Sequence, residues 1–136
     1  MHRSIQIRGI VFAAIAVILG AFGAHALKAL LPLERLQVFE TGVRYQIIHA
    51  IALIVLSLAM ANAKKYEHSD LATKWMQRAA LCMTIGIVLF SGSLYLIATS
   101  SILPFTLGAW VGPITPLGGL FFITGWTCWG IASYRG

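Results

Sequence analysis

The chain has 136 residues, of which 59% are hydrophobic and only 10% are charged, and its formal net charge at pH 7 is +6. Soluble domains carry about 25% charged residues, so this composition excludes a soluble globular domain and indicates a membrane protein. The basic residues lie at the ends of apolar segments and have no interleaved aromatic residues, which favours topology signals over nucleic-acid binding. Because no Gly/Ser-rich or Pro-rich linker divides the apolar segments, the sequence predicts one transmembrane domain over residues 1–136.

The first apolar segment, residues 10–31, follows a basic start and is long enough to cross a membrane. It imitates a secretory signal peptide with a cleavage site, but the apolar run continues past that site, so we expect no cleavage. Ala16, Gly20 and Ala24 recur every four residues and predict a flat face for helix packing. His25 lies beside this face, where both a structural and a functional role are open.

After Pro32, apolar and charged residues alternate, which predicts a short amphipathic helix along the membrane interface before the second span, residues 43–61. Glu40 and Arg44 share one helical face as an i,i+4 pair, and we predict an ion pair between them. A second face carries small and polar residues that should point into the bundle, because unpaired polar groups are costly in lipid. These residues are Gly42, Tyr45, Gln46 and His49, and we expect His49 to face the first span near His25.

The third and fourth spans are expected at residues 79–99 and 117–134. The predicted fold class is therefore an all-α integral membrane four-helix bundle, made of two transmembrane hairpins plus the interfacial helix between spans one and two. Glycines in the second hairpin predict further close helix packing. These are Gly86, Gly92, Gly118 and Gly119.

The distribution of Lys and Arg favours both termini in the cytoplasm. Seven lie on the side of the termini, namely Arg3, Arg8, Lys64, Lys65, Lys74, Arg78 and Arg135, and three lie on the other side, namely Lys28, Arg35 and Arg44. With this topology, a cluster of polar residues from the first two spans gathers on the outer side and is the candidate binding or structural site. Its members are His25, Glu40, Arg44, Tyr45, Gln46 and His49.

Four blocks of sequence carry a resemblance to a known family: GAFGAHAL at 20–27, FETGVRYQIIHA at 39–50, GSLY at 92–95 and GPITPLGG at 112–119. They resemble the signature blocks of the domain-of-unknown-function 423 family (UPF0382), which comprises the small YgdD-like and YwdK-like membrane proteins. The resemblance covers nearly the whole chain. It implies a four-span, multi-pass protein of the bacterial inner (plasma) membrane whose role is unassigned, and it implies no catalytic residues.

Three functions are compatible with this pattern. The first is a structural or interaction protein whose partners are the bilayer, other membrane proteins or a second copy. The second is a small-solute or ion carrier that acts as an oligomer, with ionisable residues of the first two spans along its path. The third is a haem or metal protein that uses His25 and His49, but no supporting ligand motif accompanies them, so we expect no cofactor and no metal. We also expect no enzymatic activity, because no Ser or Cys stands at a recognisable spacing from a histidine and an acid.

Overall fold

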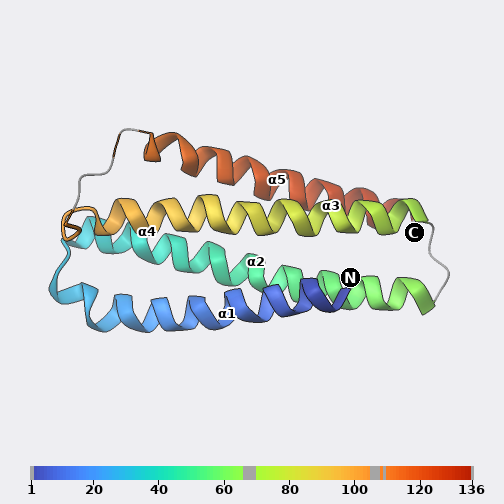
Figure 1. Cartoon of the computed structure of the whole chain (residues 1–136), viewed down its shortest axis with the longest axis horizontal. Helices are drawn as coiled ribbons and strands as arrows, with labels where there is room; N and C mark the ends of the chain where they lie inside the picture. The colour runs from blue at the N-terminus through green and yellow to red at the C-terminus, as the bar shows by residue number, and fades with distance from the viewer. Residues whose placement is uncertain (1, 66–69, 105–107, 109, 136) are drawn as a thin grey trace.

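A computed structural model of the chain describes residues 2–65, 70–104, 108 and 110–135 (Figure 1). The regular elements of these residues are all helical, and the long ones lie side by side. They are α1 (His2–His25), η1 (Leu27–Ala29), α2 (Leu33–Lys65), α3 (Asp70–Gly86), η2 (Ile87–Ser91), α4 (Gly92–Thr99) and α5 (Val111–Arg135). The π-helical turn η2 joins α3 to α4, so that these three elements form one continuous rod. The short η1 is a single 3₁₀ turn.

Among the residues that the structure describes, four helical segments are long and apolar enough to cross a membrane. They are His2–Ala29, Leu33–Asn62, Asp70–Thr99 and Val111–Arg135, of 28, 30, 30 and 25 residues. At about 1.5 Å per residue each exceeds the ~30 Å of hydrocarbon in a bilayer. The predicted all-α, four-span class is therefore confirmed.

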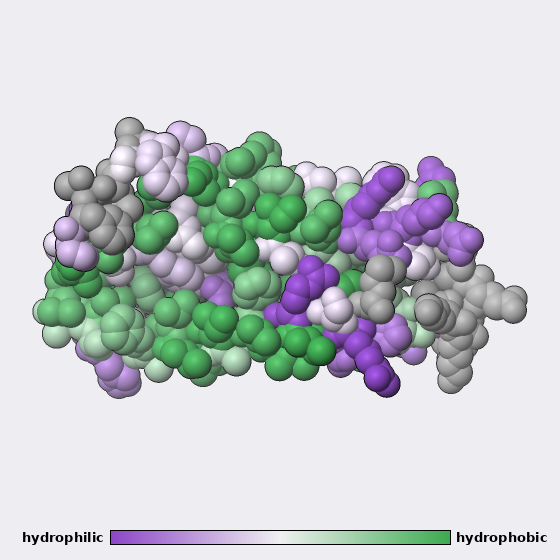
Figure 2. All heavy atoms as spheres, viewed as in Figure 1, coloured by the Kyte–Doolittle hydropathy of each residue, from purple (hydrophilic) through white to green (hydrophobic). Residues whose placement is uncertain are grey.

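The helices pack as two pairs joined through α2. Helix α1 lies against α2, α5 lies against the rod, and α2 also packs against the rod (Figure 1). Both chain ends lie at one end of the bundle, which we call the terminal end. The opposite end, where α1 turns into α2 and the rod turns towards α5, is the turn end. Hydrophobic side chains cover much of the surface, and hydrophilic ones gather towards the terminal end (Figure 2).

Helix α2 differs from the prediction, because no separate interfacial helix precedes it. Residues 33–42 form its first turns, and the helix continues without a break to Lys65. No proline follows Pro32 within this stretch, and Gly42 is buried, so that packing offsets its low helix propensity. The alternation after Pro32 therefore marks the polar end of a long helix rather than a helix of its own.

Helix α5 also begins earlier than predicted, at Val111 instead of residue 117. Both Pro113 and Pro116 lie inside its first two turns. A proline in the first turn of a helix is tolerated because the N–H that it lacks would have no intrahelical partner there. Only Pro116 removes a helical hydrogen bond, a loss that membrane helices commonly accommodate.

Glycines on one helix of each pair face large side chains on the other. In the pair of α5 and the rod, Gly86 faces Phe122, Gly118 faces Phe90 and Gly125 faces Met83; in the pair of α1 and α2, Gly9 faces Ile54 and Gly23 faces Phe39. The fit is tight: a Cβ built at Gly86 would lie 2.5 Å from Cδ1 of Phe122, and one at Gly118 would overlap the backbone nitrogen of Phe90. Inside a membrane, helices associate through van der Waals packing, because the hydrophobic effect does not drive them together there. The close fit of these glycines to large side chains therefore determines which helix faces pair.

The packing face of α1 is rotated from the one that the sequence predicted. Ala16 is buried and Gly20 lies against Val43, but Ala24 is exposed. At 3.6 residues per turn, a four-residue spacing turns about 40° around the helix at each step, whereas a seven-residue spacing drifts by only about 20°. Three of the four buried residues of α1 accordingly recur every seven residues, at 9, 16 and 23, and the fourth is Ile5, four residues before Gly9.

In the second hairpin, two predicted packing glycines make no tight contact. A Cβ at Gly92 would meet nothing within 4 Å, and one at Gly119 would lie 3.8 Å from the Phe90 ring. The neighbouring Gly118 takes the buried position instead, because α5 turns each successive residue by about 100°.

Candidate functional site

A polar core lies where α2 meets the other helices. Gln46 and His49 are buried, with 3% and 4% of their surface exposed. The Gln46 amide nitrogen donates to the carbonyl oxygen of Phe12 at 2.9 Å, and the Tyr95 hydroxyl donates to its amide oxygen at 2.9 Å. One side chain of α2 thus holds both α1 and α4. A buried amide without these partners would cost roughly 1–3 kcal/mol.

The imidazole of His49 uses both of its nitrogens inside the bundle. The indole N–H of Trp126 donates to Nε2 at 3.1 Å, and Nδ1 lies 2.8 Å from the carbonyl oxygen of Tyr45. Because an indole nitrogen can only donate, Nε2 must accept, so the proton is on Nδ1 and the ring is neutral. The ring also stacks on Phe122, with centroids 3.5 Å apart and planes 12° apart. His49 is therefore held as a packing residue between α2 and α5.

The prediction that His49 faces the first span near His25 was wrong. His49 contacts α5, whereas His25 is exposed at the turn end of α1. Gly23 lies level with Phe39, so the two histidines are about 15–20 Å apart along the bundle at ~1.5 Å per residue. At this separation they cannot bind one ion or one haem together. Helical periodicity shows which residues share a face of one helix, but it does not show which residues of α1 lie beside which residues of α2. The sequence therefore could not show that the two histidines lie at different depths.

Further side-chain hydrogen bonds join the helices, and sequence patterns gave no sign of them. Ser93 Oγ and Thr115 Oγ1 lie 2.6 Å apart and join α4 to α5. Arg35 donates to the carbonyl oxygen of Ile97 at 2.9 Å and to the hydroxyl of Ser100 at 2.6 Å, which fastens the start of α2 to the end of α4. These hydrogen bonds give the polar groups partners, which the hydrocarbon chains of lipids could not provide.

The partners of His49 also escaped the sequence analysis, although one signal pointed to them. Gly118, Phe122 and Gly125 are spaced by four and three residues and are all buried, which marks the packing face of α5. Trp126 directly follows Gly125, the last of these three residues. A count of helical period on α5 would have placed it beside the core.

An apolar cleft of about 450 Å³ opens between α4 and the beginning of α5. Its walls are almost entirely hydrocarbon, with the Ser93 hydroxyl already bonded to Thr115. The lining residues are Val88, Leu89, Gly92, Ser93, Tyr95, Leu96, Val111 and Ile114. A polar solute would find few hydrogen-bonding groups there, so the cleft offers no support for a carrier of polar solutes.

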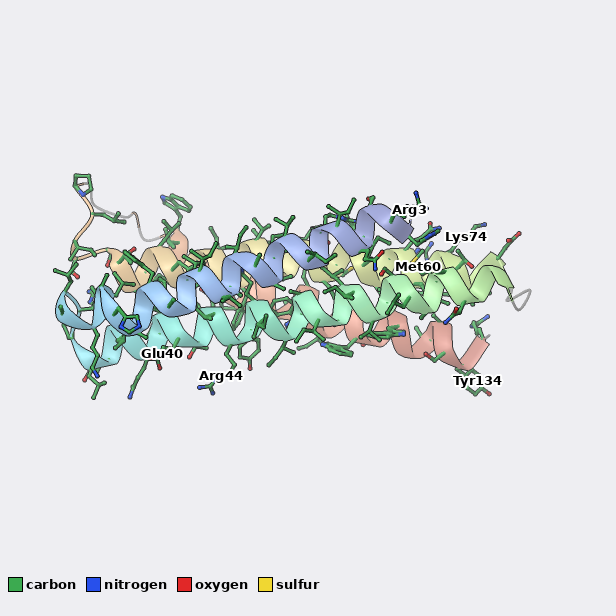
Figure 3. All side chains as sticks on the ribbon, turned by 90° about the horizontal axis from the view of Figure 1, so that it is seen from below. Arg3, Glu40, Arg44, Met60, Lys74 and Tyr134 are labelled. Atoms are coloured by element: carbon green, nitrogen blue, oxygen red, sulfur yellow. The ribbon has the colours of Figure 1, made fainter. Side chains whose placement is uncertain are left out.

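The outward face of α2 carries the remaining predicted site residues. A row of exposed residues, spaced three or four apart, runs along this helix, and we call it the α2 seam. Its members are Gln37, Glu40, Arg44, Ile48, Ile51, Val55 and Leu58. Glu40 and Arg44 project from it away from the other helices (Figure 3). Tyr45 lies beside the seam with 40% of its surface exposed.

The predicted ion pair between Glu40 and Arg44 is not formed. Within the part of the chain that the structure describes, neither side chain makes a hydrogen bond or an ion pair with another residue. Both point outward, so neither belongs to the polar core. The six residues of the predicted cluster thus divide into a buried set of Gln46 and His49 and an exposed set that includes Glu40 and Arg44.

The two charged residues lie at a level where the neighbouring helix α1 exposes hydrocarbon. Since Gly20 contacts Val43 and Gly23 contacts Phe39, the antiparallel register sets Ile18 and Phe22 of α1 level with Arg44 and Glu40. Ile18 and Phe22 are 66% and 50% exposed. The seam therefore presents an acid and a base within or at the edge of the apolar band.

Comparisons with known proteins give consistent results. The family model described as "Protein of unknown function (DUF423)" matches residues 19–119. The chain is 40% identical over 129 residues to the UPF0382 membrane protein YwdK of Bacillus subtilis, covering 95% of this chain and 94% of that protein. It is 35% identical over 130 residues to the UPF0382 inner membrane protein YgdD of Escherichia coli, covering 93% and 88%. No solved structure matches the chain significantly.

Proposed function

The chain belongs to the DUF423 family of membrane proteins, whose function is unknown, and from this premise we propose a structural or interaction role in the bacterial inner membrane. In this proposal the protein has no enzymatic activity and binds another membrane protein through the α2 seam. The polar core holds the bundle together, and the α2 seam is the binding surface.

One observation supports this proposal above the others: Glu40 and Arg44 are exposed at the level of Ile18 and Phe22, which are exposed apolar residues of α1. A charged residue at the bilayer centre costs about 2.5–3.5 kcal/mol on insertion scales, and less towards the interface. A partner helix that supplies polar groups would remove this cost. Lipid chains would not.

The bonding of the polar core argues against the carrier. Gln46 donates to Phe12 of α1 and accepts from Tyr95 of α4. His49 accepts from Trp126 of α5, so a passing solute would have to break the contacts that hold the bundle together. We therefore retain no second candidate function.

We further propose that both termini are cytoplasmic. The terminal end of the bundle carries Arg3, Arg8, Lys74, Arg78 and Arg135, and fewer basic residues lie towards the turn end. Positive charge near the ends of membrane spans is retained on the cytoplasmic side. In this orientation the charged half of the seam lies in the outer leaflet.

The proposed role is tested by replacing both charges with leucine, in the double variant Glu40→Leu and Arg44→Leu. Leucine suits lipid, so the bundle should fold, but the polar contacts to a partner are lost. Native gel electrophoresis of membranes in a mild detergent should show the wild-type chain in a complex and the variant as a smaller species. The matched control replaces Ile18 and Phe22 with leucine at the same level of α1 and should leave the complex intact. A wild-type chain that migrates as a lone bundle would contradict the proposal.

A further inference from the structure

The α2 seam is continuous over most of the membrane span. Its polar half, towards the turn end, is followed by an apolar half in which Ile48, Ile51, Val55 and Leu58 are 46%, 52%, 45% and 51% exposed. The spacings of three and four residues keep these side chains on one narrow face, as in the seam of a coiled coil. Three of the four are β-branched, a type that packs well between two parallel helices.

The polar half of the seam contains one acid and one base, Glu40 and Arg44, four residues apart. An unrelated partner would have to supply a base and an acid at matching depths. A second copy of the chain supplies both by symmetry, because in a two-fold interface residue i contacts j and j contacts i.

The geometry points to a parallel pair of α2 helices about a two-fold axis along the membrane normal. In such a pair, Glu40 of each copy lies about 6 Å along the axis from Arg44 of the other, given ~1.5 Å per residue. The side chains of Glu and Arg are long enough to span such an axial offset, and coiled coils form ion pairs between their helices. Two ion pairs would form, and the four charges would cancel.

We propose that the partner on the α2 seam is a second copy of this chain, held by two Glu40–Arg44 pairs and by the apolar half of the seam. This inference rests on the proposed function, because it names the partner of the surface proposed there.

The first test identifies the partner. A photoreactive benzoylphenylalanine in place of Ile51, in the full chain in native membranes, should cross-link to a second copy and give a product of twice the 14.8 kDa chain mass. The same group in place of Ile123 is the matched control, because Ile123 is 65% exposed and belongs to α5, which does not carry the seam. It should give no such product.

The second test asks whether the charges pair between copies. Glu40→Arg makes the polar half of the seam doubly positive, and Arg44→Glu makes it doubly negative. Each variant alone should yield about tenfold less cross-linked dimer, because like charges then meet across the interface. Co-expression of the two differently tagged variants should restore a mixed dimer. Pairing within a single helix cannot produce this recovery, and recovery also shows that both variants fold.

The outcomes separate the inference from the proposed function. Self-cross-linking from Ile51 that is lost in each variant and restored on mixing supports the inference. Cross-linking from Ile51 only to a different membrane protein overturns the inference and leaves the proposed function standing. No protein cross-link from Ile51 overturns both. If neither charge reversal changes the self-cross-linking, the Glu40–Arg44 pairs do not hold the two copies together, and the inference is overturned.

Discussion

At the scale of single residues, hydrogen-bond capacity separates polar side chains that look alike in the sequence. Ser91 and Ser93 are both buried in the rod, at 0% and 3% exposure. Ser93 bonds to the Phe90 carbonyl and to Thr115, whereas Ser91 Oγ is a buried side-chain atom without a partner among the described residues.

This contrast predicts opposite results for two chemically identical substitutions. Ser93→Ala should lower the free energy of unfolding by about 0.5–1.5 kcal/mol, because it removes a bond between α4 and α5. Ser91→Ala should cause no loss, because it removes a hydroxyl that has nothing to bind. Unfolding in mixed detergent micelles measures both. Equal losses in the two variants would show that Ser93 does not hold the helices together.

The Trp126–His49 hydrogen bond predicts a measurable coupling. Trp126→Phe and His49→Phe should each lower the free energy of unfolding, and the double variant should lose less than the sum, by about 0.5–1.5 kcal/mol. A ¹⁵N spectrum of labelled histidine should place the proton of His49 on Nδ1, because Nε2 accepts the indole N–H. Additive losses, or a proton on Nε2, would contradict this arrangement.

At the scale of elements, close glycine contacts set the register between α5 and the rod. Gly118 and Gly119 are neighbours on α5, but only Gly118 is pressed against the Phe90 backbone. The π-helical turn η2, which contains Phe90, lies at this contact. A π-helical turn is rare and occurs mostly as a single turn inside an α-helix, as η2 does in the rod.

The two glycines therefore predict different tolerance to a single methyl group. Gly118→Ala should lower the free energy of unfolding by about 1–3 kcal/mol, because the backbone of η2 must move to admit the Cβ. Gly119→Ala should be neutral or slightly stabilising, because its Cβ would lie at an ordinary 3.8 Å from the Phe90 ring. Thermal unfolding in detergent compares the pair. Equal tolerance would mean that α5 does not approach η2 as closely as described.

The sequence predicted elements better than it predicted their partners. Hydropathy gave four apolar spans, because each span must be apolar whatever it packs against. The helical period of the polar residues predicted that Gln46 and His49 lie on the inward face of α2, because residues three or four apart lie on the same side of a helix. It could not give the register between α1 and α2, so His25 and His49 were placed together wrongly. It also missed Trp126 as the partner of His49, because the period of α5 shows which residues lie beside its packing face but not which residue of another helix they contact.

At the scale of the whole molecule, the asymmetry of charge between the two ends predicts the orientation. Ser101 lies at the turn end and Ser133 near the terminal end, and both are exposed. In spheroplasts, whose inner membrane is intact, a membrane-impermeant maleimide should label the Ser101→Cys variant and should not label the Ser133→Cys variant. The wild-type chain controls for Cys82 and Cys128. The reverse pattern would show that the termini are exported.

The α2 seam of the bundle exposes an acid and a base at the level of apolar residues of α1, and the central claim is that protein covers this surface. Carbene footprinting with a lipid-soluble diazirine tests it on the unmodified chain in native membranes. The account predicts severalfold less labelling at Ile51 and Val55 on the seam than at Ile18 and Ile123, although all four are 45–66% exposed in the single chain. Equal labelling at the four positions would show that the α2 seam faces lipid and would contradict the account.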